Sequence, residues 1–552
     1  MDCLRNCPKL PWMIDFNSNE AKDVLNNQYE AAFCTSNIDY CSKLNIRSIP
    51  ARFKSTQIVC SINQNVSLNG IEELLAGGMR VAVLVAPNLE KLKEVLVKVR
   101  TMVDIFSRKI RRVVPLGIGL EIKGPEIRIG SLKGNKKQIY MEEGKETKLT
   151  IQPDLEEFVN EDMIYVDYDN LPNVVQPGDQ VILDNGSVTL VALDCVESII
   201  RCIVERAGML ISNASVTVPN ATIPLPAISA SDKELLKMAV GECVEYLFVS
   251  GIQNKQGVLD VKDILGPRGN TILIVVKIDT EIAVENIDEI IKTADGILID
   301  ADRLVIELPK EKVFLIQKSI AAKCNLAGKP IISSLSVANC TEISKSEIID
   351  ITNSVLSGTD ALLLPRNTNN RDIIKFVSII CKEAEPAIHQ KQLFSDLVSH
   401  FPAPMEPIYS LGISVVEAAS GSNAAAIVCL TSSGRTARII SRCRPRCPII
   451  VITRYPRVAR QLCLYRGAEP LIYLRPFCGE WSRDVDNRVQ LGVTYGKLMG
   501  YIKMGDVVVT VTSSRPECGM ANCMKVIYAT EFDSLPHQTR KQSQQSKRFS
   551  KH

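Results

Sequence analysis

Short apolar runs alternate with amphipathic segments along much of the chain, and the stretch 271–309 shows this rhythm most clearly. Residues 272–276 are continuously apolar and rich in β-branched side chains, which is typical of a strand buried on both faces. Between 282 and 291 apolar residues recur at near-helical spacing, and 296–299 is a second apolar run. A strand, a helix and a strand of these lengths predict a βαβ unit with parallel strands.

Similar apolar runs occur eight times, separated by helical patterns, and eight such units predict a (β/α)8 barrel. The expected strands are 57–62, 80–86, 114–122, 245–252, 271–278, 296–301, 330–335 and 361–364.

Two other parts of the chain follow different patterns. Between 125 and 224, short alternating runs and Gly-containing turns predict an all-β module inserted in a barrel loop, where it would overhang the barrel's ligand site. From about residue 390, strands expected at 424–431, 448–453, 470–474 and 506–512 predict an open α/β domain. The predicted organisation is an N-terminal segment (1–45), the barrel (46–124 and 225–389), the β module (125–224), the C-terminal domain (390–535) and a basic tail (536–552).

Composition narrows the classes of function. A formal net charge of +3 over 552 residues argues against a dedicated nucleic-acid binder, and no apolar run approaches the ~20 residues that span a bilayer. The 18 cysteines include no C-x-x-C pair, which argues against a zinc site. We therefore expect a cytoplasmic protein with reduced thiols and no membrane or nucleic-acid partner. The tail 538–552 is expected to be a solvated end; binding to an anionic surface is the alternative.

Several motifs closely resemble the pyruvate kinase family, over roughly residues 46–530. They are K-G-P-E-I-R at 123–128, K-E-K-V-F-L at 310–315, A-G-K-P at 327–330, R-P-R-C-P-I-I-V-I-T-R at 444–454, L-Y-R-G at 464–467 and W-x-x-D-V-D-x-R at 481–488. The resemblance implies the glycolytic transfer of a phosphoryl group from phosphoenolpyruvate to ADP, giving pyruvate and ATP. It also implies Mg²⁺ and K⁺ as cofactors, and a tetramer.

The resemblance assigns roles to residues that follow the barrel strands, where ligands bind in such folds. The expected catalytic residues are Lys277, Arg128 and Lys123, and the expected metal ligands are Asp279, Glu121 and Asp302. Two alternatives remain open. Arg128 can instead form a salt bridge between loops, and Asp302 reaches a metal only if its loop slips by one residue, otherwise being a surface acid or a partner of Arg303.

Other positions that the family uses for chemistry have changed. Val83 stands at the place of a catalytic arginine, and Val85, Pro87 and Ile122 replace residues that hold the monovalent cation. Arg303 occupies the place of the second metal carboxylate, and Leu335 that of a threonine tied to proton delivery. Because hydroxyls, amides and charges became apolar, or inverted in sign, we expect activity to be weak or lost.

A second site is expected in the C-terminal domain. Small hydroxyl residues and a glycine follow a strand and begin a helix, which is a natural phosphate cradle. The residues are Thr431, Ser432, Ser433, Gly434, Arg435 and Thr436, and the resemblance adds Trp481 and Arg488 as contacts of an effector like fructose 1,6-bisphosphate. The alternative is a simple helix cap.

Two functions therefore remain. The first is a divergent pyruvate kinase with residual phosphoryl transfer to or from ADP/ATP. The second is a non-catalytic relative that binds a sugar phosphate or assembles with active pyruvate kinase as a homo- or hetero-tetramer.

Overall fold

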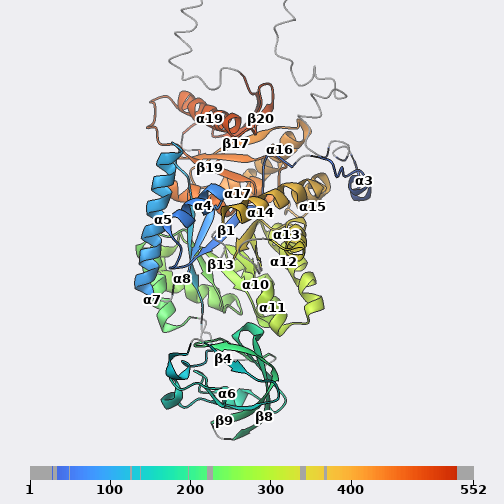
Figure 1. Ribbon diagram of the computed structural model, residues 1–552. Helices are drawn as coiled ribbons and strands as arrows, with labels where there is room; N and C mark the ends of the chain where they lie inside the picture. The colour runs from blue at the N-terminus through green and yellow to red at the C-terminus, as the bar shows by residue number, and fades with distance from the viewer. Residues whose placement is uncertain are drawn as a thin grey trace, which may run out of the picture.

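The computed structural model describes residues 28, 31 and 34–530, apart from 49, 87, 125–126, 137, 197, 220–227, 336–342, 366–369 and 517. An inserted β module lies at one end of the molecule, a barrel occupies the middle, and an α/β domain lies at the other end (Figure 1). The short helix α3 (Asn37–Ser42) precedes the barrel. Most of the N-terminal segment (1–45) and the whole basic tail (536–552) lie outside the described residues.

The predicted (β/α)8 barrel is confirmed. Eight parallel strands close into a ring, because β1 pairs with β16 as well as with β2. The strands are β1 (Gln57–Ile62), β2 (Val81–Leu84), β3 (Gly117–Ile122), β12 (Tyr246–Val249), β13 (Leu273–Ile278), β14 (Gly296–Ile299), β15 (Ile331–Ser334) and β16 (Ala361–Leu364). The surrounding helices are α4 (Leu68–Gly77), α5 (Leu89–Lys109), α7 (Ala230–Gly241), α8 (Lys255–Gly269), α9 (Glu281–Glu285), α10 (Ile287–Thr293), α11 (Ala301–Glu307), α12 (Val313–Ala327), α13 (Lys345–Leu356) and α14 (Arg371–Ala384).

The apolar pattern at 282–291 predicted a single helix, and that prediction was wrong. The structure divides this stretch into α9 and α10 at Asn286, whose backbone leaves the helical region at φ −90° and ψ 14°. The Asn286 side chain donates a hydrogen bond to the carbonyl of Gln253 (3.0 Å), and this tertiary contact accompanies the break.

Large apolar side chains fill the barrel interior. Gly117 and Gly119 on β3 make room for them, since a Cβ at either position would lie within 2.6 Å of the Tyr246 or Phe248 ring. Cys463 and Leu464, from the short helix η8 (Leu462–Leu464) of the C-terminal domain, join this cluster at the end where the strands begin. The barrel floor is therefore supplied by another part of the chain.

The inserted module has a core of its own and follows β3. Its strands are β4 (Gln138–Met141), β5 (Glu146–Thr150), β6 (Met163–Tyr165), β7 (Gln180–Leu183), β8 (Val188–Val196), β9 (Ile199–Arg206), β10 (Gly208–Ile211) and β11 (Val216–Thr217), with the short helix α6 (Leu171–Val174). Six strands form one sheet, and β4 pairs with β10. The turn Asp184–Gly186 contacts α11 of the barrel, so the module reaches over the strand ends near that helix.

The C-terminal domain is an open sheet in the order β19-β18-β17-β20-β21, with helices on its faces (Figure 1). The strands are β17 (Ala426–Leu430), β18 (Ile449–Thr453), β19 (Ala468–Ile472), β20 (Val507–Thr512) and β21 (Cys523–Tyr528), and the helices are α15 (Gln390–Ser399), α16 (Pro407–Gly421), α17 (Arg435–Arg442), α18 (Pro456–Gln461) and α19 (Trp481–Leu498). The sequence pattern missed β21, which runs antiparallel at the sheet edge. None of the described helices is both long and apolar enough for a bilayer crossing.

Candidate functional site

Charged side chains gather where β3, β13 and β14 end. The barrel register places Glu121 of β3 beside β12, and Lys277 of β13 opposite Leu298 of β14. Asp279 follows β13, and Asp300 follows β14. These carboxyl ends of parallel strands form the edge from which the β module emerges, and such edges bind ligands in barrel proteins.

The central contact of this site is an ion pair between Lys277 and Asp300. The Lys277 Nζ lies 2.7 Å from the Asp300 carboxylate, and the two side chains are only 18% and 14% exposed. Asp300 also caps α11, accepting a hydrogen bond from the Arg303 backbone N–H (3.4 Å). Burial lowers the pKa of Lys277, but Asp300, Asp279 and Glu121 raise it by more, so that its net pKa is raised and the ammonium stays charged.

A second group of charges surrounds Asp279, which is buried. Burial raises the pKa of the Glu307 carboxyl, nearby Asp279 raises it further, and Arg303 opposes this shift. Glu307, on α11, accepts a hydrogen bond from the Glu281 backbone N–H (2.9 Å) and so ties α11 to α9. Arg303 and Asp279 therefore both act electrostatically on the Glu307 carboxyl group, in opposite directions.

In the C-terminal domain, the turn 431–436 follows β17 and leads into α17. Thr431 Oγ1 accepts a hydrogen bond from the Gly434 N–H (2.9 Å), and Ser433 Oγ accepts one from the Arg435 N–H (3.4 Å). Gly434 has φ +80°, a conformation that favours glycine at this turn. The Arg435 side chain pairs with Glu406, Ser432 is exposed, and Thr436 is buried. Hydroxyl oxygens within the turn thus accept two of its own backbone N–H groups, and phosphate binding by this turn stays a prediction.

Trp481 and Arg488 lie together at the start of α19. The Arg488 guanidinium is 5.3 Å from the Trp481 ring centre and 2.8 Å from the buried Asp484 carboxylate. The Trp481 indole donates to the Ser513 carbonyl (3.1 Å), just after β20. Because β17 and β20 are adjacent and parallel, this group and the turn 431–436 share one sheet edge.

Comparisons with known proteins agree with this architecture. The family model of the pyruvate kinase barrel domain matches residues 53–373, and that of the pyruvate kinase alpha/beta domain matches 410–527. The chain belongs to the pyruvate kinase family. It is 35% identical to human pyruvate kinase PKLR over 512 residues, 91% of this chain and 89% of that protein. It is 31% identical to pyruvate kinase 1 of Trypanosoma brucei brucei over 504 residues (89% and 99%) and 30% identical to a Leishmania mexicana pyruvate kinase over 488 residues (86% and 96%).

Pyruvate kinases generally use Mg²⁺ and K⁺, and the side chains present here fit neither ion well. Within the described ranges, no group of three or more His, Cys, Asp and Glu residues is arranged to hold a metal. Magnesium in kinase sites needs one or two carboxylates besides the substrate phosphates, and Arg303, which we expected at the place of the second carboxylate, brings a positive charge near Asp279 and Glu307 instead. For K⁺, Val85 and Ile122 are buried and offer no side-chain oxygen, which leaves Glu121 as the remaining side-chain donor.

Of the six positions at which we expected a family residue to be replaced, five are described, and Val83, Val85, Ile122 and Leu335 among them are buried. Val83 packs inside the barrel with Tyr246 and Phe248. Leu335 follows β15, where its backbone N–H donates to the Leu363 carbonyl (2.9 Å) and its side chain is buried and apolar. Pro87 lies outside the described residues.

Arg128 and Lys123 lie on the connection between barrel and module. The Arg128 backbone pairs with Ser215, and its guanidinium donates to the Asn213 carbonyl (3.3 Å). The Arg128 N–H also donates to Asp167 (2.5 Å), whose carboxyl pKa is raised by burial against this hydrogen bond. Lys123 is half-buried directly after β3. The structure thus places Arg128 in the module, where it bonds a backbone carbonyl.

The structure adds two residues to the predicted barrel site, Asp300 and Glu307. Asp302, which was expected to approach a metal through a slipped loop, is exposed in the first turn of α11. Its neighbour Asp300 instead approaches Lys277. The sequence could have indicated Asp300 as a site residue, because it is a carboxylate directly after a barrel strand. It could not have indicated Glu307, which lies at the end of the helix that follows that strand.

Proposed function

We propose that this pyruvate kinase relative transfers phosphoryl groups from phosphoenolpyruvate to ADP weakly or not at all. The observation that carries the proposal is the Lys277–Asp300 ion pair (2.7 Å). In this pair a carboxylate of the chain itself neutralises the lysine that would otherwise bind the phosphoryl group of the substrate. Phosphoryl transfer depends on cations surrounding the negative oxygens, and an internal carboxylate competes with them.

The electrostatic cost of the substitutions supports the same proposal. Unit charges of like sign at 4 Å repel by about 4 kcal/mol at an effective dielectric of ~20, and Arg303 would oppose a metal at this scale. Loss of one preorganised stabilising group typically slows catalysis by ~10²–10³. The losses at Val83, Ile122 and Leu335 do not add simply, yet together they leave little rate enhancement.

Turnover of the purified full-length chain tests this proposal directly. A coupled assay with phosphoenolpyruvate, ADP, Mg²⁺ and K⁺ is expected to give at least about tenfold less turnover than an ordinary pyruvate kinase. The triple variant Val83→Arg, Arg303→Asp and Leu335→Thr is expected to raise turnover. Wild-type turnover within tenfold of an active family member would refute the proposal.

The second candidate function is a non-catalytic subunit that assembles with active pyruvate kinase. It is favoured by large apolar side chains that remain exposed on three successive barrel helices, α12, α13 and α14. They are Phe314, Leu315, Ile349, Phe376 and Ile379. Exposed apolar groups of this size mark interaction surfaces, which supports a homo- or hetero-tetramer. Co-purification with tagged active pyruvate kinase, lost in Phe376→Glu, is the expected result; no association at micromolar concentrations would reject this function.

We also propose that the turn 431–436 with Trp481 and Arg488 binds a sugar bisphosphate such as fructose 1,6-bisphosphate. The exposed Ser432 and the half-buried Arg488 beside the Trp481 ring support this ligand. A cytoplasmic location is proposed as well, since every cysteine in the described ranges is a free thiol.

A further inference from the structure

A small pocket lies between the barrel and the C-terminal domain, and α17, which begins in the turn 431–436, forms one of its sides. Its empty space is about 260 Å³. The turn after α12 supplies Gly328 and Lys329, and the residue before β16 is Asp360. From the other side, α17 and the segment after it supply Arg438, Arg442 and Arg444.

Each of the three arginines that line this pocket has one buried guanidinium nitrogen without a hydrogen-bond acceptor in the described part of the chain. These nitrogens are Nε of Arg438, Nε of Arg442 and Nη1 of Arg444. Arg444 is only 5% exposed, and its other terminal nitrogen is already used by Asn325, the Gly358 carbonyl and Asp360. Buried donors of charged groups are seldom left without an acceptor, because desolvation of such a group is costly.

Cations outnumber anions around the pocket. Lys329 and the three arginines line the pocket together with one carboxylate, Asp360. The Lys329 ammonium also donates to the Ala294 carbonyl (2.5 Å) near Asp295, and the guanidinium groups of Arg438 and Arg442 lie over aromatic rings. Both Asp360 oxygens are occupied, one by Arg444 (2.8 Å) and the other by the Ile331 backbone N–H (2.9 Å). Burial lowers the pKa of Lys329, Arg442 and Arg444, so this excess of positive charge lies in a poorly solvated place. An anion in the pocket would relieve it.

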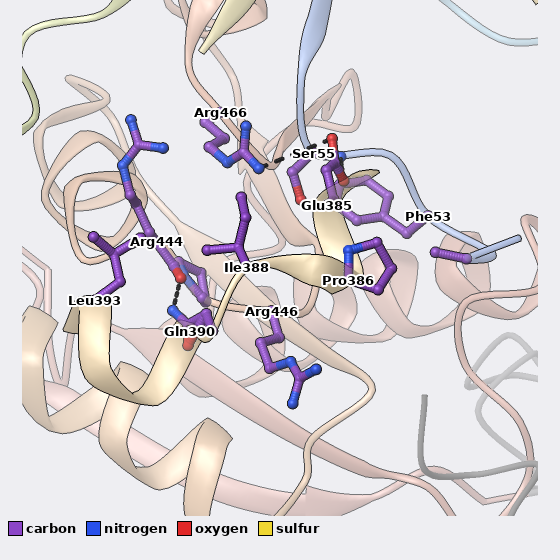
Figure 2. A pocket seen from close by; sticks show the side chains of 12 residues that line it. Phe53, Ser55, Glu385, Pro386, Ile388, Gln390, Leu393, Arg444, Arg446 and Arg466 are labelled. Atoms are coloured by element: carbon purple, nitrogen blue, oxygen red, sulfur yellow. Dashed lines mark hydrogen bonds and ion pairs between the residues drawn. The ribbon is translucent and has the colours of Figure 1, made fainter. Parts of the chain in front are cut away.

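The larger neighbouring pocket, drawn in Figure 2, shares Arg444 and is also lined by Arg446, Arg466 and Glu385. There Arg466 faces the Glu385 carboxylate at 4.0 Å (Figure 2). Glu385 also accepts the backbone N–H groups of Ser55 and Thr56. Arg438 and Arg442, which also carry buried nitrogens without an acceptor among the described residues, line the smaller pocket and are absent from the lining of the larger one.

We propose that the pocket lined by Lys329, Arg438, Arg442 and Arg444 binds a small inorganic oxyanion of the phosphate or sulfate class. The pocket is small and four of its lining side chains are cations, which favours the bare anion over a bulkier phosphate ester. Arg442 already bonds the Leu326 carbonyl, and Arg444 bonds Gly358, so the anion would complete a contact between α17 and two barrel loops. The site is separate from the sugar-bisphosphate turn and holds whether or not that turn binds a ligand.

Calorimetric titration of the full-length protein with inorganic phosphate, at ionic strength fixed with NaCl, tests the proposal. We expect one saturable site, weakened by about tenfold or more in Arg438→Gln and, from the barrel side, in Lys329→Gln. The matched control is Arg457→Gln: Arg457 also has a buried Nε without an acceptor among the described residues, but it lies on α18 and does not line the pocket. Its phosphate affinity should equal that of the wild type.

Two further titrations distinguish phosphate binding in this pocket from phosphate binding elsewhere in the protein and from binding of a phosphate ester. Arg488→Gln, in the effector group, should leave phosphate binding unchanged, and glycerol phosphate should bind more weakly than inorganic phosphate. No saturable binding at millimolar phosphate would overturn the proposal, as would unaltered affinity in both pocket variants. Equal loss in Arg457→Gln or Arg488→Gln would overturn the location, and tighter binding of glycerol phosphate would overturn the choice of a bare anion.

Discussion

Replacing Asp300 by asparagine removes the carboxylate that neutralises Lys277 and keeps the cap of α11. Asparagine caps helices about as well as aspartate, so the change isolates the charge. The Asp300–Lys277 contact is 2.7 Å long, and both side chains are largely shielded from water. We expect Asp300→Asn to free the ammonium for the phosphoryl group of phosphoenolpyruvate.

The expected gain in phosphoenolpyruvate affinity can be calculated from the repulsion between the Asp300 carboxylate and the substrate phosphate, which the substitution removes. A carboxylate and a phosphate oxygen at 4 Å repel by about 1 kcal/mol in bulk water and about 4 kcal/mol at an effective dielectric of ~20. Partial exposure of both side chains places this site between those limits, at about 1–3 kcal/mol. Phosphoenolpyruvate should therefore bind roughly five- to a hundredfold more tightly to Asp300→Asn.

The variant should also be less stable. Removal of one partner from a buried ion pair costs about 3–5 kcal/mol, reduced here because Asp279 and Glu121 stay near Lys277. The pKa of Lys277 is raised in the folded protein, so the pair's stabilisation is complete below the lysine's ordinary pKa of about 10.4. It is lost only as pH rises through the higher folded value. Binding measured at pH 6–9 is therefore free of Lys277 titration.

Calorimetry of phosphoenolpyruvate binding and the coupled turnover assay both report on the change. The control is Asp288→Asn, which breaks the exposed Lys323–Asp288 pair (2.9 Å) on the outside of the barrel and should alter neither quantity. If Asp300→Asn binds phosphoenolpyruvate no more tightly than the wild type while remaining folded, the internal carboxylate is not what blocks the site.

Three further predictions concern the C-terminal domain. Fructose 1,6-bisphosphate should raise the melting temperature of the wild type but not of Arg488→Gln; no shift in either at millimolar ligand would remove the effector proposal. Hydrogen bonds from Ser513 and Ser514 lower the pKa of Cys518 to about 7, so its alkylation rate should be half-maximal near pH 7, and a midpoint near 8.5 would contradict this. Leu464→Ala, at the barrel floor, should cost about 2–5 kcal/mol in urea unfolding, and a loss below ~1 kcal/mol would show that the floor is not tightly packed.

Much of the fold could be predicted because the barrel strands are dense in β-branched residues. Residues 272–276 are an example, since this apolar and largely β-branched run falls almost wholly within β13. The runs 57–62 and 361–364 also coincide with β1 and β16, which are largely buried. The edge strand β21 escaped because it mixes half-exposed apolar and polar residues, with Val526 49% exposed. Because an edge strand such as β21 lacks a continuous run of apolar residues, its hydrophobic pattern does not distinguish it from a loop.

The site was less predictable than the fold, because its contacting residues are far apart in the sequence. Lys277 and Asp300 are 23 positions apart in the sequence, and their contact depends on how β13 and β14 align. Motif comparison identified the substitution at Arg303, since it compares one position at a time. It did not find that Asp300 becomes the new partner of the lysine, because that follows only from the three-dimensional register.

The seal at the base of the barrel has a consequence for how the chain can be divided. Cys463 and Leu464 close the cylinder from the C-terminal domain, and the Tyr246 hydroxyl donates to the Gln461 carbonyl (2.7 Å) beside them. A truncated protein ending before that domain would open its apolar lumen to water at one mouth. The barrel therefore cannot be separated from the C-terminal domain without exposing its apolar interior, so the two parts of the chain are expected to fold and to be inherited together.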